Sequence, residues 1–296
     1  MKHYLIFLAV GATDYLNEAL FSLLSFCKNN PDTEIKTIIY TDTPDFFRSK
    51  TPQNAIVRNI SPSELSNWKG PDNFINRVKI KVLQDAVQHY SGSFLFVDSD
   101  TVFRKNISEI FIEIDKGELF FDKCEGLLEG KKGGIAKKTR KVLQKQNSFE
   151  LSTTEKAVFE KSFVVWNSGV IGLNSSHATI LKAAEELTDQ LYALEKLFVM
   201  EQLALSYLFQ KSGRPKSTEK HIHHYWYFKE FRSVLKDFFN VYHLKKFEEL
   251  VPKTTAIEPE TLAIPKLEYK KMSFFQKTTQ KILKGYKWKI PKYQLG

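Results

Sequence analysis

The stretch Phe94-Leu95-Phe96-Val97-Asp98-Ser99-Asp100 runs from four apolar residues directly into two carboxylates. Its apolar part is mostly aromatic and β-branched, which predicts a strand buried on both faces, as in a parallel sheet. Such sheets bind their ligands at the carboxyl ends of the strands. Asp98 and Asp100 lie two positions apart, so in an extended chain both side chains point the same way. Two like charges side by side repel unless a cation lies between them, so the pair predicts a metal site. A solvated strand end or a turn cap is the alternative.

Strand-like and helix-like segments alternate along the rest of the chain. Further apolar runs of strand length occupy residues 5–10, 35–40, 55–60, 117–121 and 163–166. Apolar residues recur at helical spacing over residues 16–27, 74–90, 180–194 and 198–209. Residues 68–72 are predicted to form a loop, and residues 135–144 a short basic helix after a flexible, glycine-containing segment. Strands that alternate with helices predict an α/β fold, with a mainly parallel sheet flanked by helices.

The composition excludes several classes of protein. The chain has 296 residues, of which 42% are hydrophobic, enough for a large core. The two cysteines, Cys27 and Cys124, form no Cys-x-x-Cys pair, which argues against a disulfide framework or a structural zinc site and suits a reducing cytosol. No apolar run approaches the roughly 18 residues of a membrane-spanning helix. The short run at residues 5–10 leads into a helical pattern, so we expect a first strand there, not a signal peptide, and a cytoplasmic location.

The formal net charge of +10 is concentrated at the C-terminal end. Residues 264–296 contain nine lysines and one acidic residue, so the rest of the chain is nearly neutral. Aromatic and aliphatic residues interleave with these lysines, a composition typical of segments that bind anionic lipid surfaces. A disordered basic tail is the alternative. We expect no nucleic-acid binding, because the remainder of the chain lacks a basic face. An anionic membrane surface, at the inner face of the membrane, is therefore a predicted partner.

Three further constellations could serve the carboxylate pair. His221, His223 and His224 lie in a downstream aromatic segment, and one of the last two would complete a site of two carboxylates and an imidazole. This ligand set suits Mn²⁺ or Mg²⁺. The choice between His223 and His224 stays open, and so does the simpler explanation of histidines in an aromatic patch.

The other two constellations are charged groups on predicted helices. Arg77, Lys79 and Lys81 lie in the first turns of one helix, and Arg77 and Lys81, four positions apart, share a face that could contact phosphates. A solvated helix face is the alternative. Glu201-Gln202 opens another helix, where an acidic residue commonly complements the helix dipole and could also serve a binding site.

In this order, the motifs over residues 5–231 resemble nucleotide-sugar glycosyltransferases with the GT-A fold. They are most similar to the retaining family that includes glycogenin and the bacterial lipopolysaccharide galactosyl- and glucosyltransferases. The resemblance implies that Asp98, Asp100 and a histidine bind Mn²⁺ and that Glu201 and Gln202 lie beside the transferred sugar. The implied donor-binding residues are Ala9, Asp14, Tyr15, Arg77, Lys81, Ser99, Asn167, Ser168, Gly169 and Lys229.

The chain departs from this family's pattern at two places. The family has a lysine six residues after its histidine, a spacing that connects His223 to Lys229, whereas His224 begins a His-Tyr-Trp context that better matches a ligand. The family's glycine between histidine and lysine is absent, and Glu201 stands where the family has aspartate. Both departures bear on the expected retention of configuration.

The implied function is the transfer of a sugar, expected from a UDP-sugar, to a glycan or lipid-linked acceptor in cell-surface polysaccharide synthesis. The implied organisation is a GT-A domain at residues 1–245 with a basic insertion at 123–162, followed by a basic extension at 246–296. A nucleotidyltransferase is an alternative, although only Gly11 stands where such enzymes carry a glycine-rich phosphate loop. A non-catalytic glycan- or membrane-binding protein of the same fold is another.

Overall fold

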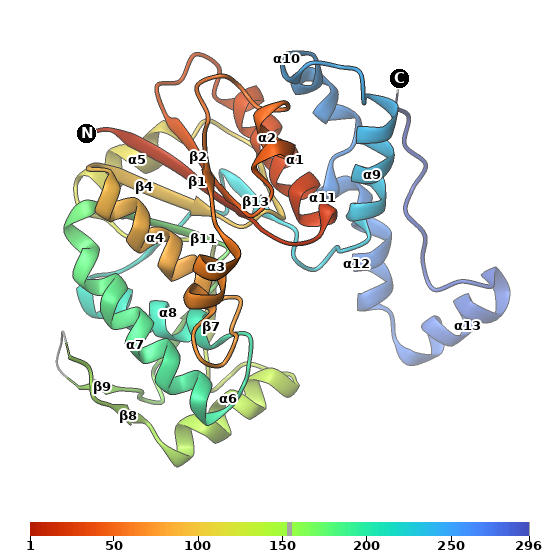
Figure 1. Ribbon diagram of the computed structural model, residues 1–296. Coiled ribbons are helices and arrows are strands. Elements are labelled where there is room, and N and C mark those ends of the chain that lie inside the picture. The colour runs from red at the N-terminus through yellow and green to blue at the C-terminus, as the bar shows by residue number, and fades with distance from the viewer. Residues whose placement is uncertain (153–155, 296) are drawn as a thin grey trace.

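A seven-stranded sheet forms the centre of the computed structural model, which describes residues 1–152 and 156–295 (Figure 1). Residues 153–155 of the predicted insertion and the last residue of the predicted extension, Gly296, lie outside the described residues. The strand order is β12-β6-β11-β4-β1-β2-β3. The strands are β1 (His3–Ala9), β2 (Lys36–Thr41), β3 (Ile56–Asn59), β4 (Ser93–Val97), β6 (Phe120–Phe121), β11 (Val170–Asn174) and β12 (Lys216–Ser217).

Most neighbouring strands of this sheet are parallel. β1 pairs in parallel with β2 and β4, β2 with β3, and β6 with β12. β11 is antiparallel to both β4 and β6. The predicted mainly parallel α/β sheet is therefore confirmed, with one reversed strand beside β4.

β4 is buried on both faces, as its apolar sequence predicts. Every residue from Ser93 to Val97 is buried. Phe94 and Phe96 pack in one core cluster with α4 (Arg77–His89), α7 (Ala178–Leu194) and α8 (Met200–Ser212). Leu95 and Val97 pack in the other cluster with α1 (Thr13–Asn29), α5 (Ser108–Asp115) and α9 (Phe231–Val241). Because successive side chains of β4 point to opposite faces, the strand packs against a helical layer on each side. The same alternation sets the orientation of Asp98 and Asp100, which follow the strand.

Further helices surround these layers, and several of them add side chains to the two clusters. They are α2 (Pro44–Arg48), α3 (Pro62–Lys69), α6 (Gly134–Lys145), α10 (Phe247–Leu250), α11 (Pro259–Leu262), α12 (Ile264–Lys271) and α13 (Phe274–Lys284), with 3₁₀ turns η1 (Ser175–His177) and η2 (Val251–Ala256). α3 contains the start of the predicted loop at residues 68–72, so that prediction is wrong there. A capping box explains the helix, since Ser61 Oγ accepts a hydrogen bond from the Glu64 amide while Glu64 accepts one from the Ser61 amide.

Three small antiparallel pairs attach segments to the sheet's carboxyl edge and to the insertion. β5 (Thr101–Phe103) pairs with β13 (Ile222–His224), and this register sets His224 opposite Thr101. β7 (Cys124–Leu127) pairs with β10 (Val164–Trp166), and β8 (Ser148–Phe149) with β9 (Ala157–Val158). The predicted flexible segment ahead of α6 therefore contains a strand.

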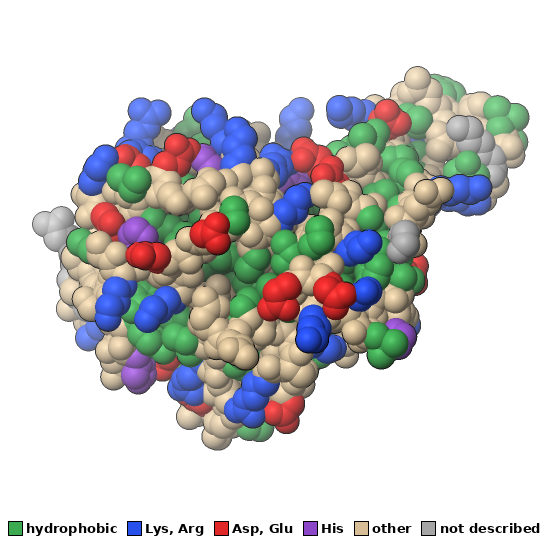
Figure 2. Space-filling model, turned by 90° about the horizontal axis from the view of Figure 1, so that it is seen from above, with side chains coloured by type: hydrophobic (Ala, Val, Ile, Leu, Met, Phe, Trp, Pro, Cys, Tyr) green, Lys and Arg blue, Asp and Glu red, His purple; other side chains and the backbone are tan. Residues whose placement is uncertain are grey.

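The C-terminal segment forms an arm that leaves the body and returns to it (Figure 1). Residues from Phe247 to Ala263 contribute to the same buried cluster as α1 and α9. α12 and α13 then project, and Figure 2 shows a protruding lobe that carries hydrophobic and basic side chains. The last residues run back along α9, where the Tyr293 hydroxyl donates a hydrogen bond to Asp237 at 2.7 Å. Among the described helices, none combines the length and hydropathy needed to cross a bilayer.

We expect Phe96→Ala to lower the free energy of unfolding by about 3–5 kcal/mol, because it removes a ring that is 0% exposed and leaves a cavity. Phe274→Ala is the matched control, since this ring is 78% exposed and its loss should change stability by less than about 0.5 kcal/mol. Urea denaturation measures both. Equal effects of the two substitutions would contradict the assignment of β4 to the core.

Candidate metal and anion site

Asp98 and Asp100 lie in the turn between β4 and β5, at the carboxyl edge of the sheet. Two hydrogen bonds hold this turn: the Asp98 amide donates to the Gly169 carbonyl at 2.8 Å, and the Thr101 hydroxyl donates to the Asp98 carbonyl at 2.8 Å. Asp100 is buried and Asp98 is half-buried. The turn therefore presents two carboxylates in a defined geometry with little water to screen them.

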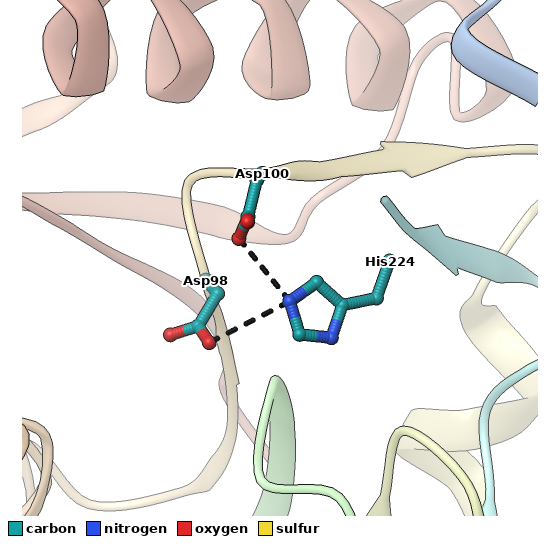
Figure 3. Close-up of side chains that lie close together, drawn as sticks. All are labelled: Asp98, Asp100 and His224. Atoms are coloured by element: carbon teal, nitrogen blue, oxygen red, sulfur yellow. Dashed lines mark hydrogen bonds and ion pairs between the residues drawn. The ribbon is translucent and has the colours of Figure 1, made fainter. Parts of the chain in front are cut away.

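His224 faces this pair from the end of β13 (Figure 3). Its Nε2 lies 3.1 Å from Asp100 Oδ1 and 3.8 Å from Asp98 Oδ2. One potential ligand atom of each of the three residues lies within 4.8 Å of the others. His223 points elsewhere, with its Nε2 3.2 Å from the Tyr227 hydroxyl. Neighbouring residues of a strand face opposite sides, so the structure brings only one of the two candidate histidines to the carboxylates, and it is His224.

Two acceptors fix the tautomer in which His224 would bind a metal. Nδ1 lies 3.3 Å from Asp122 Oδ2 and 3.2 Å from Asn167 Oδ1. Both atoms accept hydrogen bonds, so Nδ1 carries a proton, and a metal would bind at Nε2 in place of the proton that Nε2 donates to Asp100. Burial alone would lower the pKa of His224, but Asp100, the hydrogen bond to Asp122 and Asp98 raise it to about 9.

Asp122 is a site residue that sequence reasoning did not select. It follows the strand β6 directly and is 2% exposed. Its position in the sequence could have indicated it, since an aspartate that follows a predicted strand is expected at the same edge of the sheet as Asp98 and Asp100. A carboxylate behind a metal-binding histidine orients the ring and makes it a stronger ligand.

Two lysines contact the carboxylate pair from opposite elements. Lys229 Nζ, just before α9, donates to Asp100 Oδ2 at 2.5 Å, and Lys79 Nζ, on α4, donates to Asp98 Oδ2 at 2.8 Å. Burial would raise the pKa of Asp100, but His224 and Lys229 hold it well below its usual value. For Asp98 burial prevails, and the pKa is raised despite Lys79 and His224. The cluster thus combines carboxylates for a cation with ammonium groups for an anion.

Arg77 and Lys81 do not contact the carboxylate pair, and their contact with the donor stays a prediction. The Arg77 guanidinium binds Asp189 at 2.7 Å and also contacts Glu185, while Lys81 lies 3.0 Å from Glu185. Both acids belong to α7. Side chains two positions apart on an α-helix point about 200° apart around its axis. Lys79, two positions from both Arg77 and Lys81, therefore faces the sheet edge instead. All three cationic residues are evident in the sequence, but the sequence does not show how the helix is rotated about its axis. That rotation decides which of the three faces the carboxylate pair.

Glu201 and Ser168 form a second, buried part of the site. Glu201 is 1% exposed, and its Oε2 accepts a hydrogen bond from Ser168 Oγ at 3.1 Å. Its Oε1 has no partner among the residues that the structure describes. Burial raises the pKa of Glu201 to about 7, Lys79 opposing this shift and Asp98 adding to it. An unpartnered buried carboxylate oxygen is costly and is commonly satisfied by a ligand.

Glu125, on β7 of the insertion, is the second residue that sequence reasoning missed. Its carboxylate accepts hydrogen bonds from Asn167 Nδ2 at 2.9 Å and Gln202 Nε2 at 3.4 Å, and it pairs with Lys131. No motif marks Glu125, because the contact depends on how the insertion folds back over the site. The pKa of Glu125 is lowered, since the bonds from Lys131 and Asn167 outweigh the opposing effect of burial.

Gly169 leaves room for the histidine ring. A Cβ atom at this position would lie 2.1 Å from His224 Nδ1, far inside van der Waals contact. The Gly169 amide also donates to Asn167 Oδ1 at 2.9 Å. The Asn167-Ser168-Gly169 turn therefore contacts His224 and Glu201 and supports both halves of the site.

The predicted nucleoside-side residues lie at the carboxyl end of β1, next to β4 in the sheet. Ala9 ends β1, while Asp14 and Tyr15 are in the first turn of α1. Tyr15 is 41% exposed, and the Arg232 guanidinium lies 4.6 Å from its ring centroid. Arg232 also forms a bidentate pair with buried Glu18, at 3.0 and 3.1 Å. Ser99 lies between the two site aspartates, half-buried.

The donor set fits a hard or borderline divalent cation. Two carboxylate oxygens and one imidazole nitrogen suit Mn²⁺ or Mg²⁺, and there is no thiolate in the cluster. The lysines on either side would then meet an anion that binds the same cation.

No family model and no curated protein matches the chain. The chain is similar to solved structures of glycosyltransferases. One is galactosyltransferase LgtC in complex with donor and acceptor sugar analogs, at 13% identity and a TM-score of 0.47, with 69% of this chain and 70% of that one covered. Another is mouse xyloside xylosyltransferase 1, at 10% identity and a TM-score of 0.44, with 73% and 85% covered.

A third is the glycosyltransferase GlyE of Streptococcus pneumoniae TIGR4. It is 15% identical, the TM-score is 0.43, and 73% of this chain and 45% of that one are covered. All three proteins are glycosyltransferases. At these low sequence identities, the chemistry of the site can be inferred only from the residues of this chain.

We expect Gly169→Ala to weaken binding of Mn²⁺ by about tenfold or more, because the added methyl displaces a ligand ring. Gly134→Ala is the control, since a Cβ there meets nothing within 4 Å. Isothermal titration of Mn²⁺ measures both variants. Unchanged binding by Gly169→Ala, in a protein with a native circular dichroism spectrum, would exclude His224 from the ligand set.

Proposed function

We propose that the protein is a metal-dependent glycosyltransferase that moves a hexosyl group from a nucleoside diphosphate sugar, expected to be a UDP-sugar, to a glycan or lipid-linked acceptor. The observation that carries the proposal is the cluster of Asp98, Asp100 and His224 between Lys79 and Lys229. It combines a site for one divalent cation with two ammonium groups, which is the complement of a metal-bound diphosphate. Synthesis of a cell-surface polysaccharide is the process proposed for it.

Departure of the diphosphate is the step for which these groups are suited. Mn²⁺ or Mg²⁺ held by Asp98, Asp100 and His224 would neutralise the charge that develops on the leaving group. Lys229 would donate to the same oxygens, since its side chain is half-exposed and can move from Asp100 to a phosphate. The leaving phosphate can accept the proton of the acceptor hydroxyl, so the scheme needs no separate general base.

The sugar would lie against Glu201, Gln202 and the turn at residues 167–169. Glu125 accepts a hydrogen bond from Gln202 Nε2, which leaves the Gln202 amide oxygen available to an electron-poor anomeric carbon. Oε1 of Glu201, which has no partner within residues 1–152 and 156–295, could accept from a sugar hydroxyl. We propose that configuration is retained, with Gln202 on the face of the sugar opposite the leaving group. Ala9, Asp14, Tyr15 and Ser99 would contact the nucleoside part.

A panel of UDP- and GDP-sugars with Mn²⁺ tests this function by release of nucleoside diphosphate. We expect turnover that a chelator abolishes, and a loss of about 10²–10³-fold in Asp100→Asn, because the variant removes charge from the metal site. Asp45→Asn is the control, since the Asp45 side chain is 89% exposed and pairs with Arg48 of its own helix α2. No metal-dependent release or binding with any nucleotide sugar would refute the proposal. Release of pyrophosphate from nucleoside triphosphates would indicate a nucleotidyltransferase instead.

We also propose that the C-terminal arm places the enzyme on an anionic membrane surface. On α13, the side chains of Phe274, Phe275, Ile282 and Leu283 are 77–80% exposed, and lysines accompany them on the arm. Both ends of the arm are attached to the body, since Lys266 pairs with Glu230 and Tyr293 binds Asp237. An attached helix with an exposed apolar face and basic residues suits binding within the lipid headgroups.

Flotation with vesicles tests the arm. The double substitution Phe274→Ser and Phe275→Ser should abolish most binding to vesicles that contain anionic lipid, because it removes two rings that would enter the interface. Leu244→Ser is the control, since Leu244 is 85% exposed but lies on the body outside the arm. Binding should also fall at high salt. Equal flotation of the double variant and the wild type would remove the membrane from the proposal.

A further inference from the structure

We propose that Lys79 is a built-in counter-ion of Asp98, which keeps the affinity of the empty site for a divalent cation low until a diphosphate binds. The metal and the nucleotide would then bind cooperatively, each raising the affinity for the other. This inference rests on the proposed function, because it concerns the same metal site. It goes beyond the proposed function by giving Lys79 an effect on the empty metal site, in addition to its proposed contact with the diphosphate.

Lys79 contacts the carboxylate oxygen that a metal would need. Its Nζ lies 2.8 Å from Asp98 Oδ2, and the same oxygen lies 3.8 Å from His224 Nε2. This is the oxygen of Asp98 directed to the imidazole in Figure 3. A cation held between Asp98, Asp100 and His224 would therefore share Oδ2 with an ammonium group.

Lys79 has little freedom to move away. Its side chain is only 12% exposed, and the ammonium lies 5.9 Å from the centroid of the Phe96 ring. By contrast, the Lys229 side chain is 52% exposed and can turn into water when a cation enters. α4 is fixed by the Arg77 and Lys81 ion pairs to α7, so the backbone cannot easily carry Lys79 outward. The charge of Lys79 is therefore a permanent part of the site.

A divalent cation in the cluster would be repelled by this ammonium at short range, where screening is weak. A diphosphate changes the balance, because its oxygens can bind the metal and accept hydrogen bonds from Lys79 at the same time. Glu201, whose charge also acts on Lys79, is too deeply buried to reach into the cluster as a substitute anion. Linkage then requires that nucleotide strengthens metal binding by the same factor by which metal strengthens nucleotide binding.

Binding of Mn²⁺, followed by the electron paramagnetic resonance signal of the free ion, tests this without any turnover. For Lys79→Met in the absence of nucleotide, we expect Mn²⁺ affinity to rise by roughly tenfold or more, because a like charge is removed. The factor by which saturating UDP improves Mn²⁺ affinity should shrink correspondingly. Lys79→Arg keeps the charge and should behave like the wild type.

Lys81→Met is the matched control, since it removes a lysine from the same helix whose partner is Glu185 on α7. It should leave Mn²⁺ affinity unchanged. Unchanged or weaker Mn²⁺ binding by Lys79→Met, with Lys79→Gln as a second variant if the first does not fold, would overturn the inference. Failure of the wild type and of every variant to bind Mn²⁺, even with UDP, would instead refute the metal-dependent function on which it rests.

Discussion

The repulsion between Asp98 and Asp100 is the constraint on which the rest of the site depends. Burial prevents water from screening the two charges, so each carboxylate must have a cationic partner. The structure supplies Lys79 to one and Lys229 and His224 to the other. These partners come from α4, from the segment before α9 and from β13. The ion pairs that balance the two negative charges therefore hold three distant parts of the chain at one edge of the sheet.

The fold could be predicted because its main strand carries the signal in its own sequence. Residues 94–97 are apolar at every position, and the structure confirms that alternate side chains enter the two helical layers. What the sequence did not indicate was the reversed strand β11 beside β4. Strand direction depends on how connections cross the sheet, and an apolar run such as residues 170–173 has the same composition in either direction. The short helix α3 was missed because its apolar periodicity is weak and its start depends on a capping box.

The candidate site could be predicted only as far as local geometry extends. The spacing of two residues indicated that Asp98 and Asp100 act together, because side chains two positions apart point the same way in any extended chain. It could not distinguish Lys79 from Arg77 and Lys81, because the rotation of α4 is determined by its ion pairs to α7. It could not choose between His223 and His224 either, since the choice depends on the register of β13 against β5. Asp122 and Glu125 were missed for the same reason, as both act through contacts that only tertiary structure creates.

Those contacts connect the candidate metal cluster to the predicted insertion through an unbroken series of hydrogen bonds. His224 donates to Asn167, Asn167 donates to Glu125, and Glu125 accepts also from Gln202 and pairs with Lys131. Asn167 can hold His224 in its ligand tautomer only while its amide group is directed to Glu125, since the two ends of the amide have opposite polarity. Glu125 therefore acts, through Asn167, on one of the two hydrogen bonds that His224 Nδ1 makes at the candidate metal site.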